Sequence, residues 1–153
     1  MFKKLLKTLV GMSLLLMVGC QNSYEPIKIE VPKRPAGQEH AVGMTAPKLD
    51  VVRVGIIGLG MRGDGAVIRL INIPGVEITA LCDIEPERVE ECQDILRKAG
   101  LPEAAAYAGS EDAWMELCQR EDIDLVYVVT DWNSHAKMGV YAMEHGKHVA
   151  IEV

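Results

Sequence analysis

The sequence predicts an α/β fold, a Rossmann-type doubly wound parallel sheet, and three observations support this prediction. Residues 51–57 form a continuous run of mostly β-branched apolar side chains, as in a strand buried on both faces of a parallel sheet. The glycine-rich segment GLGMRG follows this run directly and leads into helical spacing. Strand and helix patterns then alternate to the last residue, which favours right-handed βαβ units with helices on both faces of the sheet.

The first two helices and the second strand are predicted from apolar spacing and turn residues. Residues 64–73 have helical spacing, and the Pro-Gly pair that follows ends this helix. The apolar run 76–82 predicts the second strand. Residues 86–99 are predicted to be the second helix, because proline occupies its first position and Gly100 lies just past its end.

The second half of the sheet is predicted in the same way. Residues 105–108 are a short third strand, and residues 111–120 are a helix. The run DLVYVV at 124–129 predicts a buried fourth strand. Residues 133–145 form a helix that ends at a glycine, and residues 147–152 begin a further strand.

The N-terminal segment MFKKLLKTLVGMSLLLMVGC, residues 1–20, predicts a secretory signal peptide. Lysines precede an apolar run from Leu9 to Val18, which is shorter than the roughly 20 residues of a membrane-spanning helix. The sequence MVGC resembles a bacterial lipobox, in which the cysteine, here Cys20, is lipidated and becomes the new N-terminus. An ordinary signal peptide with an incidental cysteine is the alternative.

Residues 21–50 have no steady hydrophobic period and are rich in proline, which predicts an extended tether. Residues 51–153 hold the predicted Rossmann domain. We therefore expect an exported protein of the bacterial cell envelope, lipid-anchored or periplasmic, with membrane attachment through Cys20.

The charge and the cysteines limit the classes of partner. A formal net charge of −6 without a basic stripe argues against nucleic acid. Cys82, Cys92 and Cys118 have no metal-like spacing, so no metal site is predicted and these thiols are interpreted as buried structural residues. A second copy of the chain remains open as a partner.

The glycines indicate a cofactor site. Gly58, Gly60 and Gly63 form G-x-G-x-x-G between a buried strand and a helix; in that order they permit the turn, admit a pyrophosphate and pack the helix close to the sheet. Asp83 ends the next strand, where a carboxylate accepts hydrogen bonds from ribose hydroxyls. The sequence predicts NAD rather than NADP, because Asp83 would repel a 2′-phosphate. Arg62 is an arginine near this site that could pair such a phosphate, and a glycine turn without a ligand is the alternative.

The segments VRVGIIGLGMRG, ALCDIEPERVE and DLVYVVTDWNSHAKMGVYAMEHGKHVAIEV resemble the N-terminal domain of the Gfo/Idh/MocA oxidoreductases. The resemblance is strongest to glycoside hydrolase family 109, the NAD-dependent α-N-acetylgalactosaminidases, and covers residues 52–153. It implies that the fold is truncated here before the family's second α/β domain. That domain holds the family's substrate-binding and catalytic residues, including a tyrosine, so no catalytic residue is assigned to this chain.

The resemblance also implies cofactor contacts. The family motif T-P-x-x-x-H lines the nicotinamide half of the cofactor, and here Asp131 replaces the proline. The alternative role for His135 is capping of the helix that follows, and His145 and His148 are interpreted as structural residues at that helix's other end. Besides the glycines and Asp83, the implied cofactor-binding residues are Met61, Arg62, Thr130, Trp132, Asn133, Ser134, His135, Glu152 and Val153.

The last two residues separate two branches of the family. Its dehydrogenases have E-K-P, in which lysine polarises the hydroxyl that loses hydride, whereas this chain has Glu152-Val153, as the E-V-P glycosidases do. The resemblance implies glycoside cleavage by oxidation at C3 of the sugar, elimination, water addition and reduction, with NAD regenerated in each turnover. The alternatives are an exported sugar or cyclitol oxidoreductase, a non-catalytic NAD-binding module, and a fragmentary gene product.

The lipobox makes a testable prediction. Cells that express the chain are grown with a fatty-acid probe, which should label the wild type but not Cys20→Ser, because only the thiol accepts the lipid. Equal labelling of both proteins would exclude Cys20 as the anchor. A wild type released in soluble form would leave only the ordinary signal peptide.

Overall fold

A computed structural model of the chain describes residues 27–30, 33, 36–37 and 42–153. The chain divides into two compact units, Met1–Thr45 and Ala46–Val153, and all described helices and strands belong to the second. The predicted signal segment with Cys20 lies outside the described residues, as does much of the predicted tether. Among the helices that the structure describes, none is both long and apolar enough to span a membrane.

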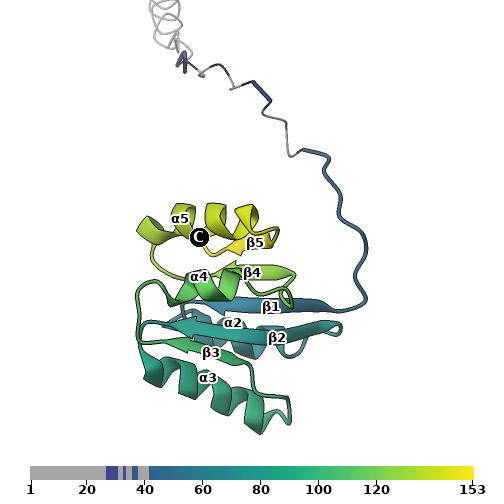
Figure 1. Ribbon diagram of the computed structural model, residues 1–153, viewed down its shortest axis with the longest axis vertical. Coiled ribbons are helices and arrows are strands. Elements are labelled where there is room, and N and C mark those ends of the chain that lie inside the picture. The colour runs from purple at the N-terminus through teal and green to yellow at the C-terminus, as the bar shows by residue number, and fades with distance from the viewer. Residues whose placement is uncertain (1–26, 31–32, 34–35, 38–41) are drawn as a thin grey trace, which may run out of the picture. The chain divides into compact units, whose positions relative to one another are not determined.

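The second unit is built on a five-stranded parallel sheet in the order β3-β2-β1-β4-β5 (Figure 1). The first strand of the sheet, β1, lies at its centre. Strands β2 and β3 follow on one side of β1, and after a crossover β4 and β5 lie on the other side. This arrangement confirms the predicted Rossmann-type fold. The strands are β1 (Val52–Ile57), β2 (Val76–Asp83), β3 (Ala105–Ala108), β4 (Leu125–Val128) and β5 (His148–Ile151).

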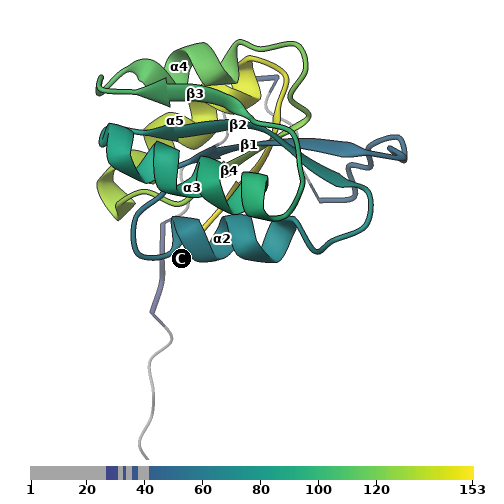
Figure 2. The same ribbon diagram turned by 90° about the horizontal axis from the view of Figure 1, so that it is seen from below.

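Helices cover both faces of the sheet, which Figure 2 shows nearly edge-on. The helices α2 and α3 pack with Val54, Ile56 and Leu81 in one buried cluster, while α4 and α5 pack with Val126 and Val128 in another. Both faces of β1 are therefore buried, as its apolar run predicts. The helices are α2 (Gly63–Leu70), α3 (Pro86–Lys98), α4 (Ala113–Cys118) and α5 (Trp132–Glu144).

Two helices are shorter than the apolar pattern predicts. Helix α2 ends at Leu70 rather than at residue 73, because Pro74 disfavours helical backbone before it and the Asn72 side chain donates to the carbonyl of Ile68 at 2.7 Å. Helix α4 covers only six of the ten residues predicted. Ser110 accepts a hydrogen bond from the backbone N–H of Asp112 at 3.2 Å, and this turn delays the start of the helix.

The predicted structural role of the thiols agrees with their burial. Cys82, Cys92 and Cys118 are free and buried in the two core clusters. Burial raises the pKa of Cys82 to about 12 and the pKa values of the other two thiols to about 11. They are therefore protonated and unreactive at neutral pH.

An ion pair joins the starts of β1 and β4. One carboxylate oxygen of Asp124 accepts hydrogen bonds from the backbone N–H and the Nε of Arg53, both at 2.9 Å, and the other accepts from Nη2 at 2.6 Å. These bonds from Arg53 lower the pKa of Asp124 to about 2. The pair fixes the register of the central strand against its neighbour at the edge of the sheet opposite to the glycine turn.

We predict that Asp124→Asn lowers the free energy of unfolding at pH 7, because the amide loses the charge that these donors stabilise. The carboxyl pKa is about 2 in the folded protein, below the roughly 3.9 of an unperturbed aspartate, so the pair stabilises the fold at pH values above about 4. The stability difference between wild type and variant, measured by urea unfolding, should shrink as the pH falls from about 4 towards 2. Asp94→Asn, in an exposed ion pair on α3, is the control with a smaller effect; equal effects would contradict the prediction.

Candidate functional site

The glycine turn after β1 has the geometry that its spacing predicts. Gly58 has φ of +90°, a left-handed conformation that L side chains rarely adopt. A Cβ on Gly63 would lie 2.1 Å from the carbonyl oxygen of Gly58. Helix α2 therefore begins in direct backbone contact with the turn, and only glycine permits that contact.

The start of α2 presents free hydrogen-bond donors. Gly63 donates to the carbonyl of Gly60 at 2.8 Å, which closes the first turn. Among the described residues, the N–H groups of Gly60, Met61 and Arg62 have no hydrogen-bond acceptor. Free N–H groups at the positive end of a helix dipole form a binding site for phosphate.

Asp83, at the end of β2, holds the same turn. Its Oδ2 accepts a hydrogen bond from the backbone N–H of Leu59 at 2.6 Å, and its Oδ1 accepts from the N–H of Glu85 at 3.0 Å. The side chain is only 4% exposed. The predicted ribose acceptor thus also fastens the glycine turn to the second strand.

Arg88, which the sequence analysis did not single out, is the arginine beside Asp83. Its Nη1 lies 3.6 Å from Oδ1 of Asp83 and 3.2 Å from the position that a Cβ on Gly60 would occupy. Arg62 instead faces Glu152, with Nη1 and Oε1 3.5 Å apart. The sequence contained one signal that could have identified Arg88: it lies in the first turn of the helix that follows Asp83.

Two cavities lie on either side of the glycine turn. The first has a volume of about 580 Å³ and the second about 350 Å³, and Val129 and Thr130 line both. The first contains the predicted residues Gly58, Gly60, Asp83, Thr130 and Ser134. The second contains Met61, Arg62, Thr130, Trp132, His135, Glu152 and Val153. Of the predicted cofactor residues, Gly63 and Asn133 line neither of these cavities: Gly63 packs inside the turn, and Asn133 is exposed on α5.

Other residues of the first cavity were missed by the sequence analysis. Trp114 is buried, and the Nζ of Lys137 lies 5.3 Å from the centroid of its ring. Ile84 follows Asp83 and is 57% exposed. They come from three separate connections of the fold, so no local motif could have grouped them. The remaining lining residues that were missed are Ile57, Cys82, Arg88, Ser110, Glu111, Asp112, Val129, Asp131 and Met138.

The loop between β4 and α5 is shaped by Asp131, the residue that replaces the family's proline. Its carboxylate accepts hydrogen bonds from the N–H of Asn133 at 2.9 Å and from the hydroxyl of Ser134 at 2.7 Å. Asp131 is therefore the N-cap, and α5 starts at Trp132, one residue earlier than predicted. The alternative role of His135 as the cap is wrong: its Nε2 lies 3.0 Å from the carbonyl oxygen of Thr130.

The other end of α5 agrees with the interpretation of His145 as structural. His145 is the C-cap residue, and its Nδ1 lies 2.8 Å from the carbonyl oxygen of Tyr141. The two rings are stacked, with centroids 4.1 Å apart. His148 begins β5, where its N–H donates to the carbonyl of Asp124. Neither imidazole lines the two cavities.

Glu152 is held at the edge of the second cavity. Its Oε2 accepts a hydrogen bond from the hydroxyl of Tyr127 at 2.7 Å, while Oε1 faces Arg62. This bond to Glu152 raises the pKa of Tyr127. The ion pair joins the N-cap residue of α2 to the residue that follows β5, and both side chains line the second cavity.

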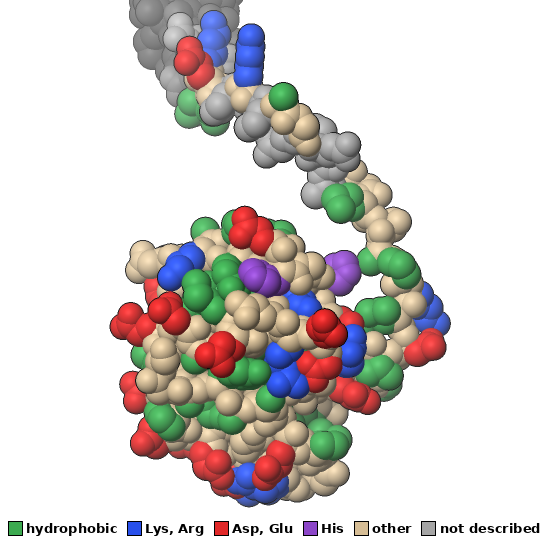
Figure 3. Space-filling model, in the orientation of Figure 1, with side chains coloured by type: hydrophobic (Ala, Val, Ile, Leu, Met, Phe, Trp, Pro, Cys, Tyr) green, Lys and Arg blue, Asp and Glu red, His purple; other side chains and the backbone are tan. Residues whose placement is uncertain are grey.

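The site fits a dinucleotide. The free N–H groups at α2 suit a diphosphate, the open Cα of Gly60 admits it, and a cavity on each side provides room for two nucleoside halves. On the face of the molecule shown in Figure 3, Lys and Arg lie in small groups among Asp and Glu.

Comparison with known families agrees with this geometry. Residues 52–153 match the family model described as "Oxidoreductase family, NAD-binding Rossmann fold". The chain belongs to the Gfo/Idh/MocA family. Its described domain is the NAD-binding Rossmann domain of that family.

Relatives with high sequence identity are glycosyl hydrolase family 109 proteins. The chain is 67% identical over 132 residues to one from Porphyromonas gingivalis, a match that covers 86% of this chain and 28% of the relative. It is 60% identical over 161 residues to one from Bacteroides thetaiotaomicron, with 100% and 34% covered. The chain thus spans about a third of the length of these relatives.

Solved structures that share the fold include dinucleotide complexes. A myo-inositol dehydrogenase from Lactobacillus casei with NAD(H) and myo-inositol matches with a TM-score of 0.56 and 32% identity, covering 66% of this chain and 28% of that one. A mutant 3-ketoreductase from Actinomadura kijaniata with TDP-benzene and NADP matches with a TM-score of 0.53 and 28% identity, covering 67% and 30%. NAD is therefore the cofactor class of this domain, and one neighbour with the same fold was crystallised with NADP.

The turn geometry predicts that Gly63→Ala abolishes NAD binding and destabilises the fold by about 1–3 kcal/mol or more, because its Cβ would collide with a backbone oxygen. The matched control is Gly65→Ala in the same helix. Its Cβ would meet only the Nη1 of Arg69, at 3.2 Å, and alanine should stabilise α2 by about 0.5–1 kcal/mol. Urea unfolding and calorimetry with NAD measure both effects; normal NAD binding by Gly63→Ala would show that the close contact is not required.

Proposed function

We propose that this domain is the NAD-binding half of an exported glycosidase that cleaves α-N-acetylgalactosaminides or similar glycosides by NAD-dependent oxidation and elimination. The support is the family, the relatives named glycosyl hydrolase family 109 proteins, and the chemistry of the second cavity. The chain supplies about a third of such a protein, so the sugar-binding and catalytic residues belong to the remaining part.

The observation that carries the proposal is Val153 at the second cavity. It lines the cavity together with Glu152 and His135. A dehydrogenase of the family has lysine here, and an ammonium group can polarise a hydroxyl or move a proton. Valine has neither property, so this position does not serve a dehydrogenase that releases an oxidised sugar.

The residues of this chain bind and orient the cofactor. When bound, NAD supplies a reversible hydride acceptor. The free N–H groups at the start of α2 hold the diphosphate, Asp83 accepts hydrogen bonds from the adenosine ribose, and the ring of Trp132, 81% exposed, provides an apolar surface at the second cavity. The Arg62–Glu152 pair fixes the mouth of that cavity.

A sugar or cyclitol oxidoreductase is the second candidate function. The observation that favours it is the likeness of the fold to the myo-inositol dehydrogenase with NAD(H) and myo-inositol. His135 lines the second cavity and is a proton-transferring group that such an enzyme would use. The two candidates differ in whether the sugar product leaves oxidised.

We further propose that the protein lies in the bacterial cell envelope and is attached through a lipid at Cys20. The support is the lipobox-like sequence and the proline-rich segment after it. A cofactor regenerated within each turnover suits a compartment without NAD recycling.

The glycosidase proposal predicts the redox balance of a full-length protein that contains this domain. A single equivalent of NAD should support many cleavage events of a nitrophenyl N-acetylgalactosaminide, with no lasting rise in NADH absorbance. In deuterated water the released sugar should carry deuterium at C2, because elimination removes that proton and solvent replaces it. The 153-residue chain alone should bind NAD and show no cleavage.

Two kinds of result would contradict the glycosidase proposal. Stoichiometric NADH together with a ketone product from a free sugar or cyclitol would overturn the glycosidase proposal and support the oxidoreductase. Cleavage of the glycoside without NAD, or without deuterium at C2, would exclude the redox mechanism.

A further inference from the structure

A tyrosine on β4 holds the carboxylate of Glu152 at the second cavity. The hydroxyl of Tyr127 donates to Oε2 of Glu152 at 2.7 Å, while the tyrosine ring packs against the core cluster that α2 and α3 share with the sheet. The bond to Glu152 raises the pKa of Tyr127, so the hydroxyl keeps its proton and remains a donor at neutral pH. A side chain anchored in the core therefore fixes where the carboxylate lies.

Glu152 is the less exposed member of the charge pair at this cavity. Its side chain is 23% exposed, whereas that of Arg62 is 64% exposed, and solvent and salt screen exposed charges more than partly buried ones. Among the described residues that line the second cavity, Arg62 and Glu152 are the only Lys, Arg, Asp or Glu side chains, and Val153 adds no positive charge. The carboxylate therefore gives the more enclosed part of this cavity a negative character.

The position of Asp83 indicates which half of the cofactor meets this carboxylate. Asp83 lines the first cavity, and in a doubly wound fold the carboxylate that ends the second strand accepts hydrogen bonds from the adenosine ribose. A dinucleotide whose diphosphate crosses the start of α2 then extends its nicotinamide half into the second cavity. The nicotinamide ring is positively charged in oxidised NAD and neutral in NADH. A carboxylate fixed at this cavity thus attracts the ring of the oxidised form alone.

We propose that Tyr127 is a positioning residue that acts through Glu152: it fixes a negative charge at the second cavity, and this charge makes the domain bind oxidised NAD more tightly than NADH. Without the hydroxyl, Glu152 is free to turn towards solvent, and the preference falls. The preference keeps the domain loaded with the form that takes hydride from a sugar. The inference rests on NAD binding by this domain and is independent of whether the complete protein is a glycosidase.

The test measures the affinities of the 153-residue chain for oxidised NAD and for NADH by calorimetry, at a pH of about 8, where imidazole side chains ordinarily carry no charge. Glu152→Gln keeps the length of the side chain and removes its charge. We expect it to lower the ratio of the two affinities by roughly fivefold to twentyfold, the range of a partly screened charge pair. The loss should fall on oxidised NAD, and higher salt should reduce the ratio more in the wild type than in this variant.

Tyr127→Phe keeps the ring in the core and removes only the hydroxyl. We expect it to lower the same ratio by about twofold to fivefold, the net worth of one hydrogen bond. In Tyr127→Phe/Glu152→Gln the ratio should equal that of Glu152→Gln alone, because no charge is left for Tyr127 to position. This non-additivity distinguishes positioning through Glu152 from an independent effect of the hydroxyl.

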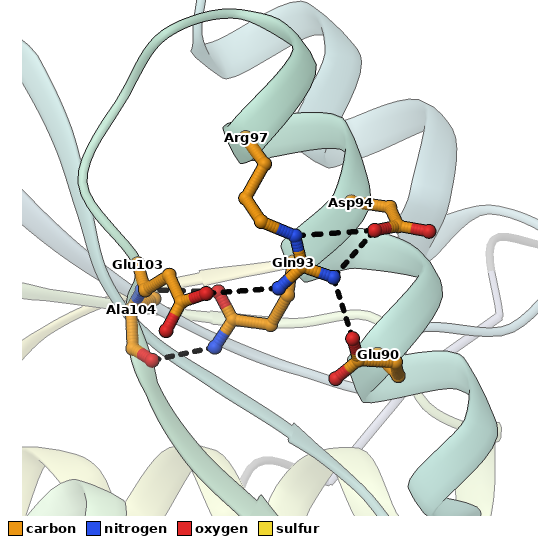
Figure 4. Close-up of polar contacts among 6 residues, drawn as sticks. All are labelled: Glu90, Gln93, Asp94, Arg97, Glu103 and Ala104. Carbon is orange, nitrogen blue, oxygen red and sulfur yellow. Dashed lines mark hydrogen bonds and ion pairs between the residues drawn. The ribbon is translucent and has the colours of Figure 1, made fainter.

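Glu103→Gln is the matched control for the loss of one negative charge. Figure 4 shows Glu103 with Glu90 and Asp94 around Arg97, whose Nη1 donates to Glu103 at 2.9 Å. None of these four residues lines either cavity. The control thus makes the same substitution in another Glu–Arg pair, and it should leave the ratio of affinities unchanged. A fall equal to that of Glu152→Gln would assign the preference to the net charge of the chain and overturn the proposal.

Two further results would overturn the proposal. Equal losses of affinity for oxidised NAD and for NADH in Glu152→Gln would show that the carboxylate shapes the cavity without sensing the charge of the ring. A further fall of the ratio when Tyr127→Phe is added to Glu152→Gln would show that Tyr127 does not act through Glu152. Glu152 lies outside both core clusters, so its substitution decides the question of charge even if Tyr127→Phe does not fold.

Discussion

The contact between Gly63 and the carbonyl oxygen of Gly58 is the constraint on which the rest of the site depends. Because no Cβ stands between them, helix α2 starts directly on the turn that ends β1. That start places free N–H groups at the centre of the sheet's edge, between the two cavities. The crossover from β3 to β4 leaves the space beside β1 open on this edge, as expected where the strand order of a doubly wound sheet reverses.

Asp83 links the fold of this site to its specificity. Its carboxylate fastens the turn through the Leu59 N–H, and its charge faces Arg88. A substitution at Asp83 therefore changes both the geometry of the turn and the charge that faces Arg88. Asp131 has a comparable structural role on the other side of the turn, where it caps α5 and fixes the loop that both cavities share.

The two cavities differ in what they need from the rest of the protein. The first cavity is lined by residues from several connections of the described domain, including the buried side chains of Trp114 and Asp83. The second is lined by Met61, Trp132 and Val153, which are 93%, 81% and 97% exposed in this chain. The proposed adenosine site thus lies within the described domain, whereas the proposed sugar chemistry rests on Val153 together with residues in the part of the relatives that this chain does not cover.

The sequence by itself determined the fold class, the glycine turn and the order of strands and helices, because apolar period, glycine spacing and proline position act over a few neighbouring residues. Even the small errors were local: a proline ended α2 earlier than the apolar pattern predicts, and a serine hydroxyl delayed the start of α4. Only the tertiary structure decided which side chains share a cavity. Arg88 forms an ion pair with Asp83, whereas Arg62 pairs with Glu152. The N-cap of α5 is Asp131 rather than His135. These contacts depend on how separate β–α connections converge at one edge of the sheet.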